Sequence, residues 1–152
     1  MPTLDQLPRV SLAFLPTPLH EAPNLARALG GPRIFIKRDD MTGLAFGGNK
    51  ARKLEFLVAD ALAQGANVLI TTGAAQSNHC RQTAAAARKL GLRCVLVLTP
   101  SHHEEFQGNI LLDALLKAEV VRCSAEAQSE TLARVAADER ACLLYTSPSP
   151  RD

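Results

Sequence analysis

Two polar segments carry side chains that could do chemistry, and each leads into a predicted helix. The first reads T-G-L-A-F-G-G-N-K over residues 42–50. Its last residue, Lys50, falls in the first turn of the helix, where the positive end of the helix dipole disfavours a cation. We expect this position to lower the pKa of Lys50 and to free its amine as a nucleophile, which Schiff-base chemistry requires. Spacing alone favours a simpler interpretation, in which Asn49 caps the helix and Lys50 faces solvent.

The second segment reads T-G-A-A-Q-S-N-H over residues 72–79. Backbone N–H groups at the start of a helix form a site for a carboxylate or a phosphate. Spacing alone again favours a structural interpretation, in which Ser77 or Asn78 caps the helix. Ser77 and His79 have no evident acidic partner, and residues 73–77 are not a G-x-S-x-G elbow, so a hydrolase triad has little support. A dinucleotide site has little support either, because no G-x-G-x-x-G follows a predicted strand.

Metal chemistry is not expected. Residues 102–105 read H-H-E-E, but adjacent residues in a loop rarely converge on one ion, so we predict a solvated loop. The cysteines form no C-x-x-C pair, which argues against a zinc site or a redox pair; they are Cys80, Cys94, Cys123 and Cys142. Cys94 lies in an apolar run and is expected to be buried. The absence of paired cysteines favours a reducing cytosol.

Composition excludes several classes of protein. The chain has 152 residues, 17 Lys and Arg against 15 Asp and Glu, and 47% apolar residues. No apolar run approaches the roughly 20 residues that cross a bilayer, and no signal peptide is evident at the N-terminus. The charges are mixed rather than clustered, which argues against a nucleic-acid partner. The apolar content is too high for a disordered chain.

Helical and strand patterns alternate along the chain. Helices are predicted at residues 22–29, 49–64, 78–90, 109–118 and 125–140, and strands at 33–37, 67–72, 93–98 and 119–123. This order predicts a parallel sheet with helices on both faces, a three-layer α/β architecture. The inward leucines of helix 109–118 are predicted to be Leu111, Leu112, Leu115 and Leu116.

Five motifs occur together in order: L-P-T-P-L at 15–19, I-K-R-D-D at 36–40, G-G-N-K-A-R-K-L at 47–54, Q-S-N-H at 76–79 and G-N-I-L-L at 108–112. They resemble the family of D-cysteine desulfhydrases and 1-aminocyclopropane-1-carboxylate (ACC) deaminases. The resemblance covers about residues 8–125 and is far more specific than any single motif. It implies an incomplete tryptophan synthase β-like fold, the fold-type II of enzymes that depend on pyridoxal 5′-phosphate.

The resemblance also implies a role for particular residues. Lys50 matches the lysine that joins the cofactor and moves protons at the substrate carbon. Asn78 matches the residue that hydrogen-bonds the cofactor ring oxygen, and Lys53 is matched to the cofactor phosphate. Ser77 matches a residue at the substrate carboxylate that also acts in the chemistry of the deaminases, and Asn78 and His79 complete the carboxylate site.

The implied activity is a lyase reaction on a small amino acid. The Q-S-N-H motif is closer to the desulfhydrases, so we expect elimination of sulfide and ammonia from a D-amino acid such as D-cysteine, giving pyruvate. The alternatives are a ring-opening ACC deaminase, or a non-catalytic α/β module that binds a small anion at residues 76–79. A cytoplasmic homodimer without nucleic-acid or membrane partners is expected for the full-length parent.

Family members are roughly twice as long as this chain, which predicts an N-terminal part of a larger enzyme. Residues 1–48 are assigned to the larger cofactor-binding domain and residues 49–141 to a truncated smaller α/β domain. Residues 142–152 break the helical pattern and contain two Ser-Pro steps, so we predict a foreign tail derived from a sequencing adapter. The chain alone is expected to be inactive, because half of the cofactor site is missing.

Overall fold

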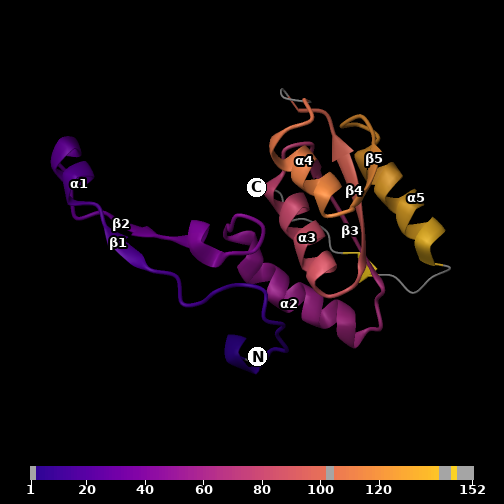
Figure 1. Ribbon diagram of the computed structural model, residues 1–152, viewed down its shortest axis with the longest axis horizontal. Helices are drawn as coiled ribbons and strands as arrows, with labels where there is room; N and C mark the ends of the chain where they lie inside the picture. Colours follow the sequence, from indigo (N-terminus) through magenta and orange to yellow (C-terminus); the bar gives the residue numbers. More distant parts are fainter. Residues whose placement is uncertain (1–2, 102–104, 141–144, 147–152) are drawn as a thin grey trace.

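A computed structural model describes residues 3–101, 105–140 and 145–146 of the chain. Its body is a parallel sheet with the strand order β5-β4-β3-β6. The strands are β3 (Val68–Ala74), β4 (Arg93–Thr99), β5 (Glu119–Arg122) and the short β6 (Tyr145–Thr146). The helices are α2 (Lys50–Ala63), α3 (Asn78–Lys89), α4 (Gly108–Leu115) and α5 (Gln128–Arg140). Helices α2, α3 and α4 cover one face of the sheet and α5 covers the other (Figure 1).

Alternating side chains along β3 and β4 fill two separate cores. Leu69 and Leu96 point to the face covered by α2 and α3, whereas Ile70 and Val97 point to the face covered by α5 and its Val135. Both sets are buried, as expected for a parallel strand covered on its two sides. The prediction of a three-layer α/β fold is therefore confirmed.

Helix α3 packs closely because its inner face is made of small residues. The alanines at positions 84–87 are all at most 5% exposed. Cys94 is buried on the facing strand, as predicted. Short side chains let a helix backbone approach the sheet, and this close packing sets the position of the α3 N-terminus at the carboxyl end of β3.

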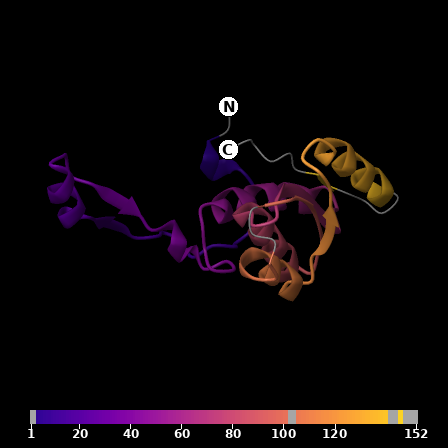
Figure 2. The ribbon, with the colours of Figure 1, turned by 90° about the horizontal axis from the view of Figure 1, so that it is seen from above.

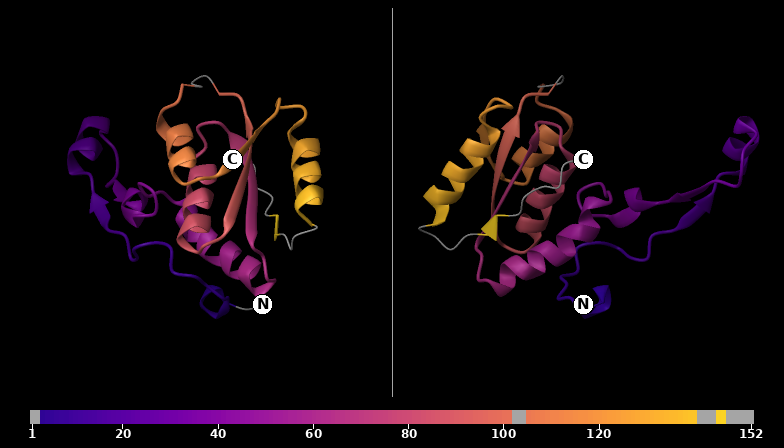
Figure 3. Two further views of the ribbon diagram at one scale, coloured as in Figure 1. Left: turned by 45° about the vertical axis from the view of Figure 1, so that its right-hand side comes forward. Right: turned by 180° about the vertical axis from the view of Figure 1, so that it is seen from behind.

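An arm precedes this body, and it corrects one prediction. The arm contains two short 3-10 turns, η1 (Leu4–Gln6) and η2 (Asp39–Thr42), and a hairpin. In the hairpin, β1 (Leu19–Glu21) pairs antiparallel with β2 (Phe35–Lys37), and α1 (Pro23–Leu29) lies between them. The hairpin projects away from the sheet (Figure 2; the two views of Figure 3 agree).

The strand predicted at 33–37 was assigned to the parallel sheet, and this assignment is wrong. Every residue of β1 and β2 is exposed, so neither strand belongs to a core in this structure. The sequence gave no clear signal for β1, because its three residues lie between the prolines at positions 18 and 23. A short antiparallel partner close in sequence competes successfully with a distant parallel one, because closing a small loop costs less entropy.

Two buried carboxylates anchor the arm to α2. Arg52 donates hydrogen bonds to both oxygens of Asp39, at 2.9 and 2.7 Å. This pairing lowers the pKa of Asp39 to about 2. The carboxylate of Glu55, 1% exposed, accepts from the backbone N–H groups of Leu12 and Ala13, each at 2.9 Å. The helix that begins at the candidate site is therefore fixed to the N-terminal segment.

The last part of the chain adds one strand pair. β6 runs parallel to β3, with Tyr145 and Thr146 opposite Leu69 and Ile70. The rest of the predicted foreign tail at 142–152 lies outside the described residues, and so do residues 102–104 of the H-H-E-E motif. Across the described ranges no helix is long and apolar enough to cross a membrane. The same ranges contain no cluster of three or more potential metal ligands.

Candidate active site

A tight glycine loop leads into Lys50. Four consecutive residues have positive φ: Ala45 at 44°, Phe46 at 68°, Gly47 at 72° and Gly48 at 133°. A Cβ on Gly47 would lie 2.0 Å from the carbonyl oxygen of Asp40, and a Cβ on Gly48 would lie 2.4 Å from Nε2 of Gln82. Only glycine fits at these two positions. The loop is therefore a strained element that other contacts must hold in place.

Lys50 is the first residue of α2 and is partly buried. The preceding Asn49 occupies the cap position, but its side chain makes no capping hydrogen bond. The structural interpretation of this segment, in which Asn49 caps and Lys50 simply faces solvent, is thus not supported. Lys53, one turn later, is also partly buried.

The second segment forms the start of α3. Ser77 is the N-cap, and its Oγ accepts from the backbone N–H of Cys80 at 3.3 Å, which confirms the capping prediction. The hydroxyl hydrogen of Ser77 remains available to a ligand, because capping uses only the oxygen lone pair. The side chain of Asn78 is exposed at this end of the helix. The residues predicted for the substrate and the cofactor ring therefore lie at a helix N-terminus.

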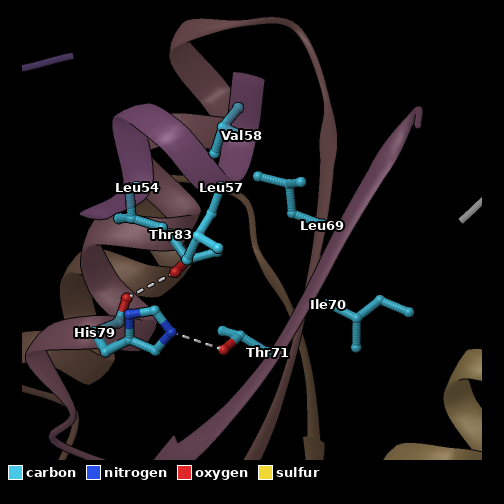
Figure 4. A pocket seen from close by; sticks show the side chains of 8 residues that line it. All are labelled: Leu54, Leu57, Val58, Leu69, Ile70, Thr71, His79 and Thr83. Carbon is cyan, nitrogen blue, oxygen red and sulfur yellow. Dashed lines mark hydrogen bonds between the residues drawn. The ribbon is translucent and has the colours of Figure 1, made fainter. Parts of the chain in front are cut away.

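The ring of His79 points elsewhere. It is 5% exposed, and its Nε2 lies 3.0 Å from Oγ1 of Thr71 on β3. Its backbone carbonyl accepts from Thr83 at 2.9 Å. Figure 4 shows the ring at the edge of a small, mainly apolar cavity between α2, α3 and β3. The imidazole thus lies in the core side of the helix, apart from the exposed end that carries Asn78.

Arg81 ties the two segments together. Its side chain is buried, and it donates to the carbonyl oxygens of Ala45 at 2.6 Å and Gly47 at 3.0 Å. Arg81 lies one turn after Ser77, and Gly47 lies three residues before Lys50. A single guanidinium therefore connects the strained loop before Lys50 with the first turn of α3. Nothing in the local sequence pattern distinguished this arginine.

Asp113 of α4 is the acidic group nearest to this arginine in effect. Its carboxylate is 1% exposed, and burial raises its pKa to about 7, although the positive charge of Arg81 acts in the opposite direction. The same burial lowers the pKa of Arg81, and Asp113 opposes that shift. The helix prediction here was partly wrong: Leu115, expected to face inward, is 69% exposed, because α4 turns Asp113 toward α3 instead.

Comparison with known proteins identifies this arrangement. The family model described as "Pyridoxal-phosphate dependent enzyme" matches residues 10–149. The chain belongs to this family. D-cysteine desulfhydrase of Salmonella paratyphi B is 52% identical over 139 residues, which are 86% of this chain and 42% of the relative. The chain thus spans less than half the length of the curated relatives it matches.

Solved structures agree with the family assignment. A crystal structure of an ACC deaminase homologue superposes with a TM-score of 0.86 at 43% identity, over 95% of this chain and 45% of the other. Escherichia coli diaminopropionate ammonia lyase superposes with a TM-score of 0.69 at 21% identity, over 84% of this chain and 37% of the other. The second likeness concerns the fold alone. The predicted family and fold type are confirmed.

The donors of this site fit the family cofactor. Pyridoxal phosphate needs a primary amine that can join its carbonyl carbon, and a hydrogen-bond donor at its ring oxygen. Lys50 supplies an amine that is partly buried, and Asn78 supplies an exposed carboxamide. Arg81 holds the loop that precedes Lys50 against the helix turn that carries Asn78. The two donors therefore belong to one connected region of the structure.

Asp113 provides a prediction about pH. Its pKa in the folded protein, about 7, exceeds its value of 3.8 in an unfolded chain. The folded state therefore holds this proton more tightly, so its contribution to stability is fully present below pH 4 and is lost as the pH rises through 7. Relative to Asp113→Asn, the unmodified protein is expected to gain on the order of 1 kcal/mol per pH unit between pH 7 and pH 5.

Urea unfolding of both proteins at pH 5, 6 and 7 measures this difference. The measurement uses a full-length enzyme that carries this segment. Asparagine keeps the size of the side chain and removes the ionisable group, so it is the matched reference. Parallel pH dependences in the two proteins would contradict the assigned pKa.

Proposed function

We propose that this chain supplies part of the active site of a pyridoxal-phosphate-dependent lyase. The proposed reaction converts D-cysteine and water to pyruvate, ammonia and hydrogen sulfide. The observation that carries the proposal is the 52% identity to a D-cysteine desulfhydrase across a segment that contains Lys50, Ser77 and Asn78. When bound, the cofactor withdraws electrons from the α-carbon of the substrate.

The residues of the chain divide the remaining tasks. Lys50 holds the cofactor through its amine and then moves a proton at the α-carbon of the substrate. Asn78 orients the cofactor through its ring oxygen, and Lys53 contacts the phosphate. Ser77 donates its hydroxyl hydrogen to the substrate carboxylate. The carboxylate site also uses the N–H groups at the start of α3, where the helix dipole favours an anion.

The proposal for His79 is narrower than the sequence expectation. Its ring contacts Thr71 inside the core, so we assign its backbone N–H, rather than the imidazole, to the carboxylate. The contact with Thr71 gives the ring a second task, which is to fix the first turn of α3 against β3. The substrate carboxylate is then bound by main-chain groups and by the Ser77 hydroxyl.

The second candidate function is ACC deamination. It is favoured by the likeness to the ACC deaminase homologue, which is 43% identical. Ser77 would then act in ring opening as well as in carboxylate binding. Both candidates use Lys50 and Asn78 in the same way, so these residues do not separate them.

An assay with both substrates separates the candidates. A full-length enzyme carrying this segment is expected to release sulfide from D-cysteine, with a kcat/KM at least about a hundredfold above that for ACC, a difference of about 2.7 kcal/mol in transition-state binding. L-cysteine is the matched control, because it has the same groups in the opposite configuration. Faster formation of 2-oxobutanoate from ACC would replace the first candidate with the second.

Three broader assignments accompany this function. We propose that the arm belongs to the larger cofactor-binding domain, because its strands are exposed on every residue in this chain. We propose a cytoplasmic enzyme of amino-acid metabolism, which the free thiols of Cys80, Cys94 and Cys123 support. A homodimer is the proposed assembly, and the mass of the full-length enzyme in solution tests it.

A further inference from the structure

A chain of hydrogen bonds joins the start of α4 to the side chain of Asn78. Nδ2 of Asn109 donates to the backbone carbonyl of Gln76 at 2.7 Å and to Oδ1 of Asn78 at 3.0 Å. The backbone N–H of Asn109 donates to Oε1 of Gln76 at 2.8 Å. Nε2 of Gln76 donates to the carbonyl oxygen of Gln107 at 3.2 Å. Asn109 is thus bonded to the residue that carries the proposed cofactor contact.

Backbone groups fix the direction of every bond in this network. A main-chain carbonyl only accepts, so the atom of Asn109 beside the carbonyl of Gln76 is the NH₂ group. The second hydrogen of that group then points to Asn78, which has to offer its oxygen. By the same logic, the main-chain N–H of Asn109 and the carbonyl of Gln107 fix the amide of Gln76.

The consequence falls on the exposed end of Asn78. Its Oδ1 is committed to Asn109, so the group it presents to a ligand is the NH₂ donor. An amide turned the other way would present an oxygen to the ring oxygen of the cofactor, and two acceptors repel each other. A freely rotating Asn78 would populate both orientations. Asn109 removes the unfavourable one before the cofactor arrives, which is preorganisation of a binding group.

We propose that Asn109 is a positioning residue that holds the carboxamide of Asn78 with its N–H groups toward the cofactor ring oxygen. This inference rests on the proposed function, because it assumes that Asn78 contacts the cofactor. Asn109 itself acts only through Asn78. The G-N-I-L-L motif therefore has a task beyond starting a helix: its second residue sets the polarity of a side chain 31 positions earlier.

The experiment is a double-mutant cycle in a full-length enzyme carrying this segment. Asn109→Asp replaces the donor with a group that only accepts, so Asn78 has to invert to bond with it. The affinity of the apo-enzyme for pyridoxal phosphate is measured by absorbance titration for the unmodified protein, Asn109→Asp, Asn78→Ala and the double variant. Asn109→Asp is expected to weaken binding at least about tenfold when Asn78 is present, and less than about twofold in the Asn78→Ala background.

A second pair of variants controls for a merely structural effect. Gln76→Leu removes the other side-chain bonds between the same two loops and leaves the bond from Asn109 to Asn78. Its cost in cofactor affinity is expected to be the same in both backgrounds. The absorption maximum of the bound cofactor provides a second readout, which is expected to shift in Asn109→Asp and not in Gln76→Leu.

The outcomes separate this inference from the function beneath it. Equal losses for Asn109→Asp in both backgrounds, or no loss with Asn78 present, would overturn the positioning role alone. An unmodified enzyme that binds no pyridoxal phosphate, or an Asn78→Ala variant with unchanged affinity, would overturn the proposed function and this inference together.

Discussion

Replacing Lys50 by alanine in a full-length enzyme is expected to lower kcat by about a thousandfold or more. The amine has two tasks in the proposed mechanism, holding the cofactor and moving the proton at the α-carbon, and general acid–base catalysis alone contributes about 10²–10⁴-fold. Lys50 is partly buried at the first position of α2, and alanine is a good helix former, so the fold is expected to survive. Steady-state assays with D-cysteine measure the loss.

Two matched variants show which property of Lys50 matters. Lys50→Arg keeps the positive charge, but a guanidinium is always protonated and is no nucleophile, so it is expected to be as inactive as Lys50→Ala. Lys53→Ala removes a cation one turn away, and is expected to weaken cofactor affinity while retaining most of kcat at saturating cofactor. A Lys50→Arg variant with more than a tenth of the original kcat would contradict the assignment.

Replacing Arg81 by methionine is expected to have the second-largest effect. The change removes two hydrogen bonds to the carbonyls of Ala45 and Gly47 and leaves Asp113 buried without its cation. Breaking a buried charge interaction typically destabilises a protein by about 3–5 kcal/mol. The freed loop also carries Lys50, and a misplacement of about 1 Å can lower a rate about a hundredfold. Urea unfolding and kcat are therefore both expected to fall.

The two effects of Arg81 can be separated. Arg81→Lys keeps a positive charge near Asp113 but cannot donate to both carbonyls in the same fork geometry, so kcat is expected to fall more than stability does. The double variant Arg81→Met/Asp113→Leu removes the uncompensated carboxylate and is expected to recover part of the stability, with kcat still low. A double variant that recovers kcat as well would show that the loop does not need this arginine.

The architecture of the body could be predicted because its signals are local. The apolar run of β4, the alanines of α3 and the stripe of α2 each declare an element within about a dozen residues. The family resemblance added candidate residues at matched motifs. Ser77 was recognised as a cap from its own position before a helix, and the structure agrees.

The supporting residues could not be predicted in the same way. Arg81 and Asn109 act on partners that lie 34 and 31 positions away, and no periodic pattern encodes such pairs. Asp113 lies in a leucine-rich helix, where periodicity assigned the inner face to its neighbours. The hairpin of the arm escaped prediction because three-residue strands carry almost no alternation. Local patterns thus located the elements, whereas the contacts that hold Lys50 and Asn78 depend on the folded chain.

Borohydride reduction of the full-length enzyme with bound pyridoxal phosphate tests the central claim most directly. The reagent converts the C=N bond between cofactor and lysine to a stable single bond, so the modified peptide can be located by mass spectrometry. The account predicts that the label lies on Lys50, and that the Lys50→Ala protein carries none. A label on Lys53 or on any other lysine, or no label in an enzyme that binds the cofactor, would contradict it.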